Sequence, residues 1–293
     1  MDQPRRSFLK GLAFTGASIA GSALPAVASE EKLQAPDDAV GMLYDTTKCI
    51  GCKACVVACH EANDLPPDNR DNPLHDMPTD LNDRTKNIIK LYKGDEQRSY
   101  VKQQCMHCID PACAAACMIG SFQKREYGIV TWDPNRCIGC RYCQMACPYH
   151  IPKFEWDEAA PRIIKCELCN HRIAEGKEPA CCEVCPRGAV IYGTHKELLA
   201  EAKQRLADNP DRYVPKIYGE HDGGGTQVLY LSHVEFENLG LPTLGDEGTA
   251  NLNRTVQHGV YKGMVAPAAL YAVLGGVMLR NRMAGKQDEG GES

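Results

Sequence analysis

Residues 137–148 read Cys-Ile-Gly-Cys-Arg-Tyr-Cys-Gln-Met-Ala-Cys-Pro. The four cysteines are spaced C-x2-C-x2-C-x3-C. The same spacing occurs at residues 49–59, which also begin with Cys-Ile-Gly-Cys. Each copy follows a short apolar stretch and a turn led by an aspartate, at residues 41–48 and 128–136. The sequence therefore predicts an internal repeat of strand, turn and cysteine loop.

Two further cysteine groups have wider middle gaps. Residues 105–117 have four residues between the second and third cysteines, and residues 166–185 have eleven. We number the groups one to four in chain order. Together they hold sixteen of the 17 cysteines and leave Cys182 outside. The sixteen are Cys49, Cys52, Cys55, Cys59, Cys105, Cys108, Cys113, Cys117, Cys137, Cys140, Cys143, Cys147, Cys166, Cys169, Cys181 and Cys185.

Soft thiolate ligands presented from tight loops are typical of iron–sulfur clusters. In this spacing the first three cysteines converge on one cubane, and the fourth ligates the other cluster of a pair. Pro148 and Pro186 complete the ferredoxin pattern after groups three and four, whereas His60 and Met118 stand at this position in groups one and two. The cysteines therefore predict four [4Fe–4S] clusters.

The order of the groups indicates how they pair. Groups two and three are neighbours in the sequence, as in a two-cluster ferredoxin, and groups one and four enclose them. Exchanging the fourth cysteines within each pair gives four ligand sets. Set A is Cys49, Cys52, Cys55 and Cys185; set B is Cys166, Cys169, Cys181 and Cys59; set C is Cys105, Cys108, Cys113 and Cys147; set D is Cys137, Cys140, Cys143 and Cys117.

Two other uses of cysteine compete with clusters. Zinc sites also use C-x2-C pairs, but the repeated groups supply more thiolates than a tetrahedral ion takes. Disulfides suit an exported protein, but 17 is an odd number and closely spaced cysteines would not all find partners. Cys182 is expected to be a spare thiol, or to replace Cys181 as a ligand if the register differs by one residue. A metal-binding structural protein without electron transfer stays an alternative.

Polar residues near the loops have less specific roles. His60, His107 and His150 are expected to pack or to hydrogen-bond cluster sulfur rather than to ligate iron. No set of catalytic residues stands out in the sequence. We therefore expect a protein that relays electrons without substrate chemistry of its own.

Three cations lie beside the cysteines. Lys165, Arg141 and Arg187 either raise the potential of a neighbouring cluster or are solvated surface charges. Elsewhere the charge is unremarkable, because the 293-residue chain has a formal net charge of −5 and no basic patch interleaved with aromatics. Nucleic acid is therefore not expected as a partner.

The N-terminal residues 1–28 are predicted to be a twin-arginine export signal. Residues 4–10 read Pro-Arg-Arg-Ser-Phe-Leu-Lys, a weakly apolar stretch follows, and residues 26–28 read Ala-Val-Ala. An ordinary secretory signal is the alternative. The twin-arginine route accepts folded cargo, which suits a protein loaded with clusters in the cytoplasm.

Residues 260–280 are predicted to be a transmembrane helix, and a buried soluble helix is the alternative. Residues 263–279 contain no charge, and Arg280 and Arg282 follow at once. Because positive residues favour the cytoplasmic side, the tail at 281–293 is expected in the cytoplasm. The sequence thus predicts a single-pass protein of the inner (cytoplasmic) membrane with its main domain on the periplasmic side.

Other segments give a coarse picture of the body. Residues 87–92 and 99–102 are expected to form a β-hairpin, and the polar insertion at 61–86 to be a surface loop. Residues 195–208 have helical spacing, with Thr194 and Glu197 predicted to form a capping box.

With these groups in place, the chain resembles the four-cluster ferredoxin-like electron-transfer subunits of respiratory oxidoreductases over about residues 41–208. It is most similar to the iron–sulfur subunit of hydrogenase-2-type membrane [NiFe] hydrogenases. The matching segments are Gly41-Met-Leu-Tyr-Asp, Lys102-Gln-Gln-Cys-Met-His-Cys108, Cys140-Arg-Tyr-Cys143, Lys165-Cys-Glu-Leu-Cys-Asn170 and Gly224-Gly-Thr-Gln-Val-Leu.

The resemblance implies an α+β fold of two ferredoxin-like modules, each holding two clusters. One module would combine residues 41–60 with 160–208, the other would use 99–150, and 209–258 would be an extension. The pairing of groups one and four also rests on this resemblance.

The resemblance also implies a function. Such subunits take electrons from the hydrogenase small and large subunits and pass them to an integral membrane subunit that reduces quinone. The alternative is the equivalent subunit of a molybdenum or tungsten oxidoreductase, such as a formate dehydrogenase or a polysulfide, nitrite or sulfoxide reductase. Those subunits often lack their own twin-arginine signal.

Overall fold

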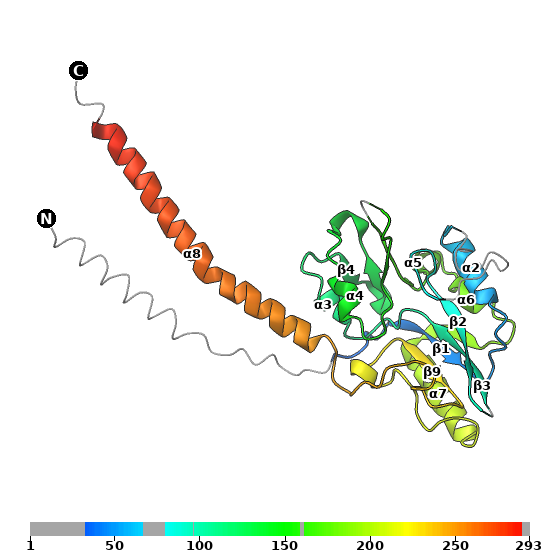
Figure 1. Ribbon diagram of the computed structural model, residues 1–293. Helices are drawn as coiled ribbons and strands as arrows, with labels where there is room; N and C mark the ends of the chain where they lie inside the picture. The colour runs from blue at the N-terminus through cyan, green and yellow to red at the C-terminus, as the bar shows by residue number, and fades with distance from the viewer. Residues whose placement is uncertain (1–32, 67–79, 96, 159–160, 289–293) are drawn as a thin grey trace. The chain divides into compact units, whose positions relative to one another are not determined.

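The structure is a computed structural model that describes residues 33–66, 80–95, 97–158 and 161–288 (Figure 1). The predicted export signal lies outside the described residues. So do the middle of the polar insertion and the last five residues of the predicted tail. Within the described part, helices and strands are mixed along the chain, with helices generally short apart from two.

A three-stranded sheet lies at the centre of the body, in the order β8-β1-β9. Strand β1 (Val40–Asp45) pairs antiparallel with β8 (Val190–Thr194) and parallel with β9 (Val228–Leu231). Strand β9 comes from the stretch expected to be an extension. All six residues of β1 are buried, as expected for a middle strand covered on both faces.

The two faces of β1 pack against different cores, because successive side chains of a strand point to opposite sides. Met42 and Tyr44 belong to the largest cluster of buried hydrophobic residues, which also contains cysteines of all four groups. Leu43 faces a second cluster made with helix α7 (His195–Asp208). The sheet therefore separates the cysteine-bearing side of the body from α7.

Helix α7 begins as the sequence predicts. The Thr194 side chain accepts a hydrogen bond from the backbone N–H of Glu197, and the Glu197 carboxylate accepts one from the backbone N–H of Thr194. This reciprocal arrangement satisfies two backbone donors that a helix start leaves free. The predicted capping box and the helix bounds are both confirmed.

The expected hairpin is also confirmed. Strand β2 (Ile88–Lys93) pairs antiparallel with β3 (Arg98–Gln103) over six residue pairs. Helix α2 (Ala54–Ala62), which carries the end of group one, lies against helix α6 (Ala180–Glu183) of group four. Segments far apart in the sequence thus bring groups one and four together.

Groups two and three are joined by smaller elements. Helix α3 (Ala112–Ala115) of group two lies against helix α4 (Tyr142–Ala146) of group three. A small core of its own includes Cys113 and Cys143. The remaining short elements are β4 (Phe122–Lys124), η1 (Glu126–Gly128), β5 (Val130–Trp132), η2 (Pro134–Arg136), β6 (Lys153–Phe154), β7 (Ile163–Ile164), α5 (Asn170–Ala174) and η3 (Asp222–Gly224).

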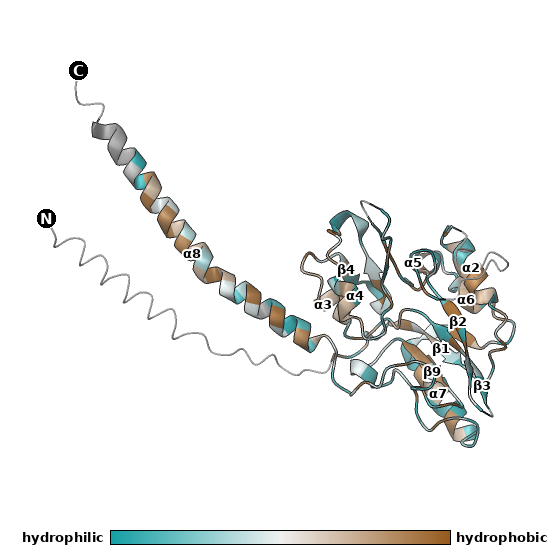
Figure 2. Cartoon of the chain, viewed as in Figure 1, coloured by the Kyte–Doolittle hydropathy of each residue, from teal (hydrophilic) through white to brown (hydrophobic). Residues whose placement is uncertain are grey.

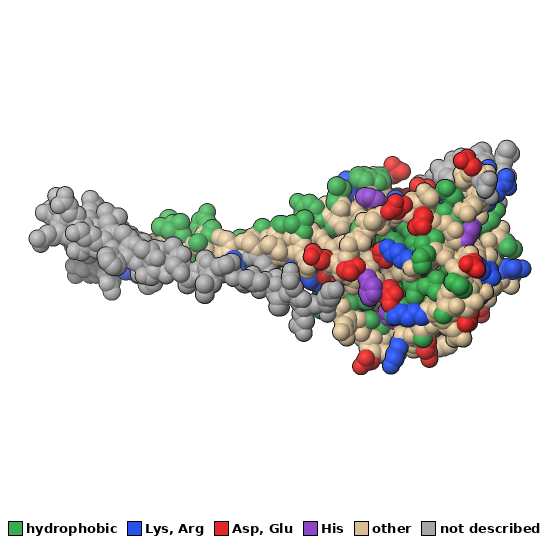
Figure 3. Space-filling model, turned by 90° about the horizontal axis from the view of Figure 1, so that it is seen from below, with side chains coloured by type: hydrophobic (Ala, Val, Ile, Leu, Met, Phe, Trp, Pro, Cys, Tyr) green, Lys and Arg blue, Asp and Glu red, His purple; other side chains and the backbone are tan. Residues whose placement is uncertain are grey.

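Helix α8 (Asn251–Asp288) is the longest element and includes Pro267. Its residues 251–280 are long and apolar enough to cross a membrane, judged by length and composition alone. Figure 2 shows the run of hydrophobic residues along it, and Figure 3 shows charged side chains of both signs on one face of the body. Near its start, Arg254 pairs with Asp110 of group two.

Candidate iron–sulfur sites

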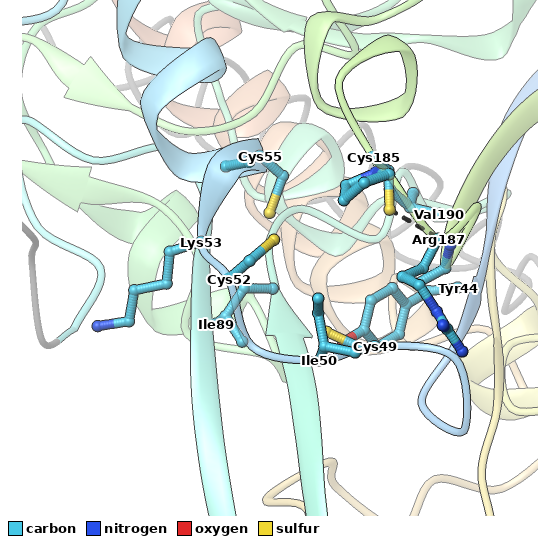
Figure 4. Close-up of a pocket in the computed structure, with 13 residues that line it drawn as sticks. Tyr44, Cys49, Ile50, Cys52, Lys53, Cys55, Ile89, Cys185, Arg187 and Val190 are labelled. Carbon is cyan, nitrogen blue, oxygen red and sulfur yellow. Dashed lines mark hydrogen bonds between the residues drawn. The ribbon is translucent and has the colours of Figure 1, made fainter.

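The cysteines of set A line one pocket. Cys49, Cys52 and Cys55 come from the loop after β1 and the start of α2, and Cys185 follows α6. Figure 4 shows their sulfur atoms turned toward the space between these two segments. The fourth cysteine of group four therefore lies with the first three cysteines of group one, in the arrangement that the spacing predicts.

The C-x-x-C turns share an unusual backbone. The residue two positions after the first cysteine has a positive φ in all four groups, at 72° for Gly51, 47° for His107, 70° for Gly139 and 54° for Leu168. This conformation turns backbone N–H groups inward. In group one the N–H of Gly51 lies 3.4 Å from the Cys49 Sγ, and in group four the N–H of Leu168 lies 3.4 Å from the Cys166 Sγ.

A second set of backbone donors follows the fourth cysteines. The N–H of Ser121 lies 3.2 Å from the Cys117 Sγ, and the N–H of Ala189 lies 3.3 Å from the Cys185 Sγ. Hydrogen bonds of this kind favour the charged thiolate over the thiol. The loops are thus arranged to stabilise negative charge on sulfur.

Set B takes its first three cysteines from group four and its last from group one, the reverse of set A. The Asn63 Nδ2 lies 3.7 Å from the Cys59 Sγ and 3.9 Å from the Cys169 Sγ, so one amide reaches both groups. Burial raises the pKa of Cys59 to about 12, and the charge of Cys181 adds to this effect. The structure therefore brings Cys59 beside the first three cysteines of group four.

Sets C and D each combine cysteines of groups two and three, as sets A and B combine those of groups one and four. After burial, the charges of Cys105 and Cys147 are the largest influences that raise the pKa of Cys113. For Cys143, burial and then Cys140 raise the pKa to about 12, and Cys117 contributes as well. Each fourth cysteine thus lies with the partner group rather than only with its own.

The buried thiols need a bound cation to lose their protons. Burial raises the pKa of Cys55 to about 12 and that of Cys147 to about 11, so without a cation they stay protonated at neutral pH. Iron would displace these protons. In the described part of the chain, no three His, Cys, Asp or Glu residues are grouped to hold a single metal ion. None of the 17 cysteines, including Cys182, forms a disulfide.

Two buried lysines lie among the cysteines. Lys102 in β3 is 0% exposed and Lys165 is 2% exposed. Burial lowers the pKa of Lys102, but the charges of Cys181, Cys55 and Cys166 more than offset it and hold the pKa above its ordinary value. Sequence reasoning singled out Lys165 by its position beside Cys166 but missed Lys102, which looks like any lysine of a strand.

The two arginines named with Lys165 behave differently. The guanidinium carbon of Arg141 lies 3.8 Å from the centre of the Trp156 ring and 4.7 Å from that of Phe154. Arg187 lines the pocket of set A but is exposed. The charge of Arg141 therefore lies over aromatic rings, and the charge of Arg187 is solvated.

The histidines have distinct surroundings. His107 is fully buried, and its Nδ1 accepts a hydrogen bond from the backbone N–H of Val130 at 3.1 Å. Burial lowers the pKa of His107, so the ring stays neutral. His60 Nε2 lies 3.3 Å from the Thr85 hydroxyl, and His150 is exposed.

Cys182 is buried beside Cys181. A hydrogen bond from the Cys182 thiol lowers the pKa of Cys181, and the charge of Lys102 does so as well. Cys182 therefore lowers the pKa of the adjacent predicted ligand, Cys181.

Two models of the 4Fe-4S dicluster domain match the chain, at residues 41–118 and 97–195. The chain therefore belongs to the 4Fe-4S dicluster family, and its two domains carry four [4Fe–4S] clusters. The resemblance inferred from the cysteine groups is confirmed at this level.

The curated relatives show which kinds of iron–sulfur protein the chain is similar to. The chain is 41% identical to the hydrogenase-2 operon protein HybA of Escherichia coli O157:H7, over 98% of both chains. It is 38% identical to the iron–sulfur subunit of the nitrate-inducible formate dehydrogenase of Escherichia coli K12, over 66% of this chain and 68% of that one. The formate dehydrogenase-O iron–sulfur subunit of the same strain is 36% identical over 78% of this chain and 77% of that one.

Proposed function

We propose that sets A to D each hold one [4Fe–4S] cluster through four thiolates. The pocket of set A carries this proposal, because its four cysteines come from groups one and four as the exchange of fourth cysteines requires. When bound, each cluster supplies one-electron chemistry. The chain's own residues hold the thiolates, direct backbone N–H groups at sulfur and keep water from the buried sets.

The four sets follow one another in the order A–B–C–D. The charge of Cys181 of set B raises the pKa of Cys55 of set A, and the charge of Cys105 of set C raises the pKa of Cys166 of set B. The charge of Cys143 of set D acts on Cys113 of set C. These interactions between neighbouring sets support an electron path in the order A–B–C–D.

The ends of this line are open to partners. Among the seventeen cysteines, only Cys52 of set A and Cys140 of set D are exposed. Near set D, helix α3 contacts α8, and the Tyr261 hydroxyl lies 3.4 Å from the carbonyl oxygen of Met118. We assign the end at set D to the acceptor in the membrane and the end at set A to the catalytic donor.

The chain would then be an electron-transfer subunit between a periplasmic [NiFe] hydrogenase and a quinone-reactive membrane subunit. Relatedness to HybA over nearly the whole chain supports this role more than relatedness to formate dehydrogenase subunits over two thirds of it. Helix α8 would anchor the protein in the inner membrane. The residues of the predicted twin-arginine signal would direct the two ferredoxin-like modules to the periplasm.

The first test is gentle solubilisation of membranes followed by identification of the catalytic subunit that co-purifies. A [NiFe] hydrogenase is expected, whereas a molybdenum or tungsten enzyme would favour the alternative. Iron and acid-labile sulfide should be near sixteen each per chain, as four clusters require. Colourless protein with far less iron would contradict the cluster assignment.

The ligand sets are tested by a matched pair of substitutions. Cys140→Ala removes an exposed end ligand, and about a quarter of the iron is expected to be lost, since one of four clusters is affected. Cys166→Ala removes a buried ligand between sets B and C, so more than one cluster and much of the fold should be lost. Equal iron loss in both variants would contradict the interior position of set B.

A further inference from the structure

The interior of the body contains two cations without a carboxylate partner. Lysine is among the residues least often fully buried, yet Lys102 and Lys165 are both buried. Neither takes part in an ion pair within the described residues. An ammonium group removed from water without a counter-charge is strongly destabilising. Some other negative charge must therefore compensate Lys102, and it must add to the charge of Glu167, which pairs with Lys86, at Lys165.

Lys102 is held at the junction of sets A and B. Its ammonium donates to the side-chain oxygen of Gln104. The Gln104 amide is itself fixed, because its Nε2 lies 3.2 Å from the Met42 Sδ. The cysteines whose charges raise the pKa of Lys102 most are Cys181 of set B and Cys55 of set A.

Lys165 is held at the junction of sets B and C. Its ammonium donates to the backbone oxygens of Val130 and Cys166, the latter at 2.8 Å. The same nitrogen lies 3.9 Å from the Cys105 Sγ of set C. Backbone and sulfur contacts thus fix this second charge between two sets, with Glu167 contributing at longer range.

The junction of sets C and D has no such lysine in the described part of the chain. The strongest influences on Cys143 of set D are burial, a backbone hydrogen bond and its partner cysteines Cys140, Cys117 and Cys137. Two cations are adjacent in sequence to set D cysteines: Arg141 lies over Trp156, and Arg136 is largely exposed and pairs with Asp133 at 3.4 Å. The buried positive charge therefore lies beside sets A, B and C, where Lys124 also acts on Cys108 of set C, and not beside set D.

We propose that Lys102 and Lys165 are fixed counter-charges of the interior clusters and place the reduction potentials of sets B and C above that of set D. This inference rests on the proposed function, since it requires a cluster at each set. A fixed positive charge in a low-dielectric interior stabilises the added electron. Each reduction adds one electron and changes no bond and no proton. An electron in the chain therefore resides preferentially on the interior sets, with set B favoured by both lysines.

The experiment measures the potentials directly. The full chain is purified with its membrane partners, and clusters are followed by electron paramagnetic resonance during a redox titration. Lys102→Gln and Lys165→Gln remove one charge each with little change in side-chain size. We expect the highest-potential signals to need at least a tenfold greater reduced-to-oxidised ratio of the mediator, which is 59 mV for one electron.

The matched control is Lys196→Gln, because Lys196 is exposed on α7 and outside the cysteine groups. Its titration should match that of the wild type. Unchanged midpoints in Lys102→Gln and Lys165→Gln proteins that carry full iron would overturn the proposal. Wild-type protein without four clusters would instead overturn the proposed function, because iron is counted before any variant is compared.

A neutral substitution can also prevent cluster loading, so charge-retaining variants are measured beside it. If Lys102→Gln loses iron while Lys102→Arg keeps it, the positive charge is what the site requires, and the proposal is supported. If both variants lose iron equally, the requirement is for the shape of lysine alone, and the proposal is overturned. The same comparison applies to Lys165→Arg and Lys165→Gln.

Discussion

Groups one and three have the same cysteine spacing and, in the structure, the same local backbone. Four residues before the first cysteine, Asp45 and Asp133 each accept a hydrogen bond from the backbone N–H two residues on, at 3.0 and 2.9 Å. Gly51 and Gly139 have φ angles of 72° and 70°. A short motif therefore determines the loop that presents the sulfur atoms, wherever the loop lies in the fold.

The surroundings of these two loops differ. Group one packs into the largest core, with buried Lys102 acting on Cys55. Group three reaches the largest core only through Cys147, packs otherwise against a small core, and leaves Ile138 and Met145 72% and 80% exposed, against 53% and 39% for the equivalent Ile50 and Val57. Spacing thus sets the ligands, whereas long-range packing sets the charge around a loop and the surface it offers. Substitutions at equivalent positions separate the two contributions.

The largest difference is expected between Asp45→Ala and Asp133→Ala. Asp45 is fully buried, and its Oδ2 accepts from the Tyr213 hydroxyl at 2.9 Å and pairs with Arg205 at 3.2 Å. Removing it breaks the buried pair with Arg205 and the bond from Tyr213, but Arg205 keeps Glu201 at 2.7 Å, so the cost is about 3 kcal/mol, the low end for a broken buried pair. Asp133 caps only a short turn, so its loss costs about 0.5–2 kcal/mol. Thermal bleaching of the cluster absorbance measures both; equal shifts would show that the turn alone matters.

A smaller difference is expected between Gly51→Ala and Gly139→Ala. Both positions have a positive φ, which costs an L-residue about 1–2 kcal/mol. A Cβ at Gly51 would also lie 2.2 Å from the Tyr100 ring, whereas at Gly139 the nearest atom is 3.6 Å away on Phe154. The overpacking adds about 1–3 kcal/mol at Gly51 only. Comparing the melting temperatures of the two variants checks this; a Gly139→Ala protein that is the less stable would refute it.

The smallest difference is expected between Arg141→Met and Lys53→Met, at equivalent left-handed positions before α4 and α2. Arg141 lies over Trp156, and losing this cation–π contact costs about 0.5–2 kcal/mol. In Figure 4, Lys53 extends away from the sulfur atoms of set A. Its substitution should change stability by less than about 0.5 kcal/mol. Urea-induced bleaching of the cluster absorbance measures the stability of both variants. Arg141→Lys should recover part of the stability that Arg141→Met loses.

Features encoded locally could be predicted from the sequence. The hairpin of β2 and β3, the bounds of α7 and its capping box follow from alternation, helical spacing and the Thr194–Glu197 signature. The exchange of fourth cysteines was inferred from the spacing and, for groups one and four, also from the family resemblance, and it stays a prediction that the pocket of set A supports. The hairpin, the helix and its capping box are legible because each depends on residues close together in the chain.

Features that depend on distant partners were not predictable. Strand β9 is a four-residue apolar run, and nothing near it specifies pairing with β1. His107 and Leu168 adopt a positive φ that their side chains do not favour, because the turn between two ligating cysteines imposes it. Lys102 was missed since a lysine in an alternating strand is usually solvated, and only the assembled core shows otherwise.

The pocket of set A draws three sulfurs from residues 49–55 and one from residue 185. On a ribosome, this pocket does not exist until synthesis has passed groups two and three and Cys185 has emerged from the exit tunnel. Closing it joins the two ends of the cysteine-bearing region around everything between them. Whatever loads this pocket therefore acts on a polypeptide of at least 185 residues, and unloading it reopens the loop between residues 55 and 185.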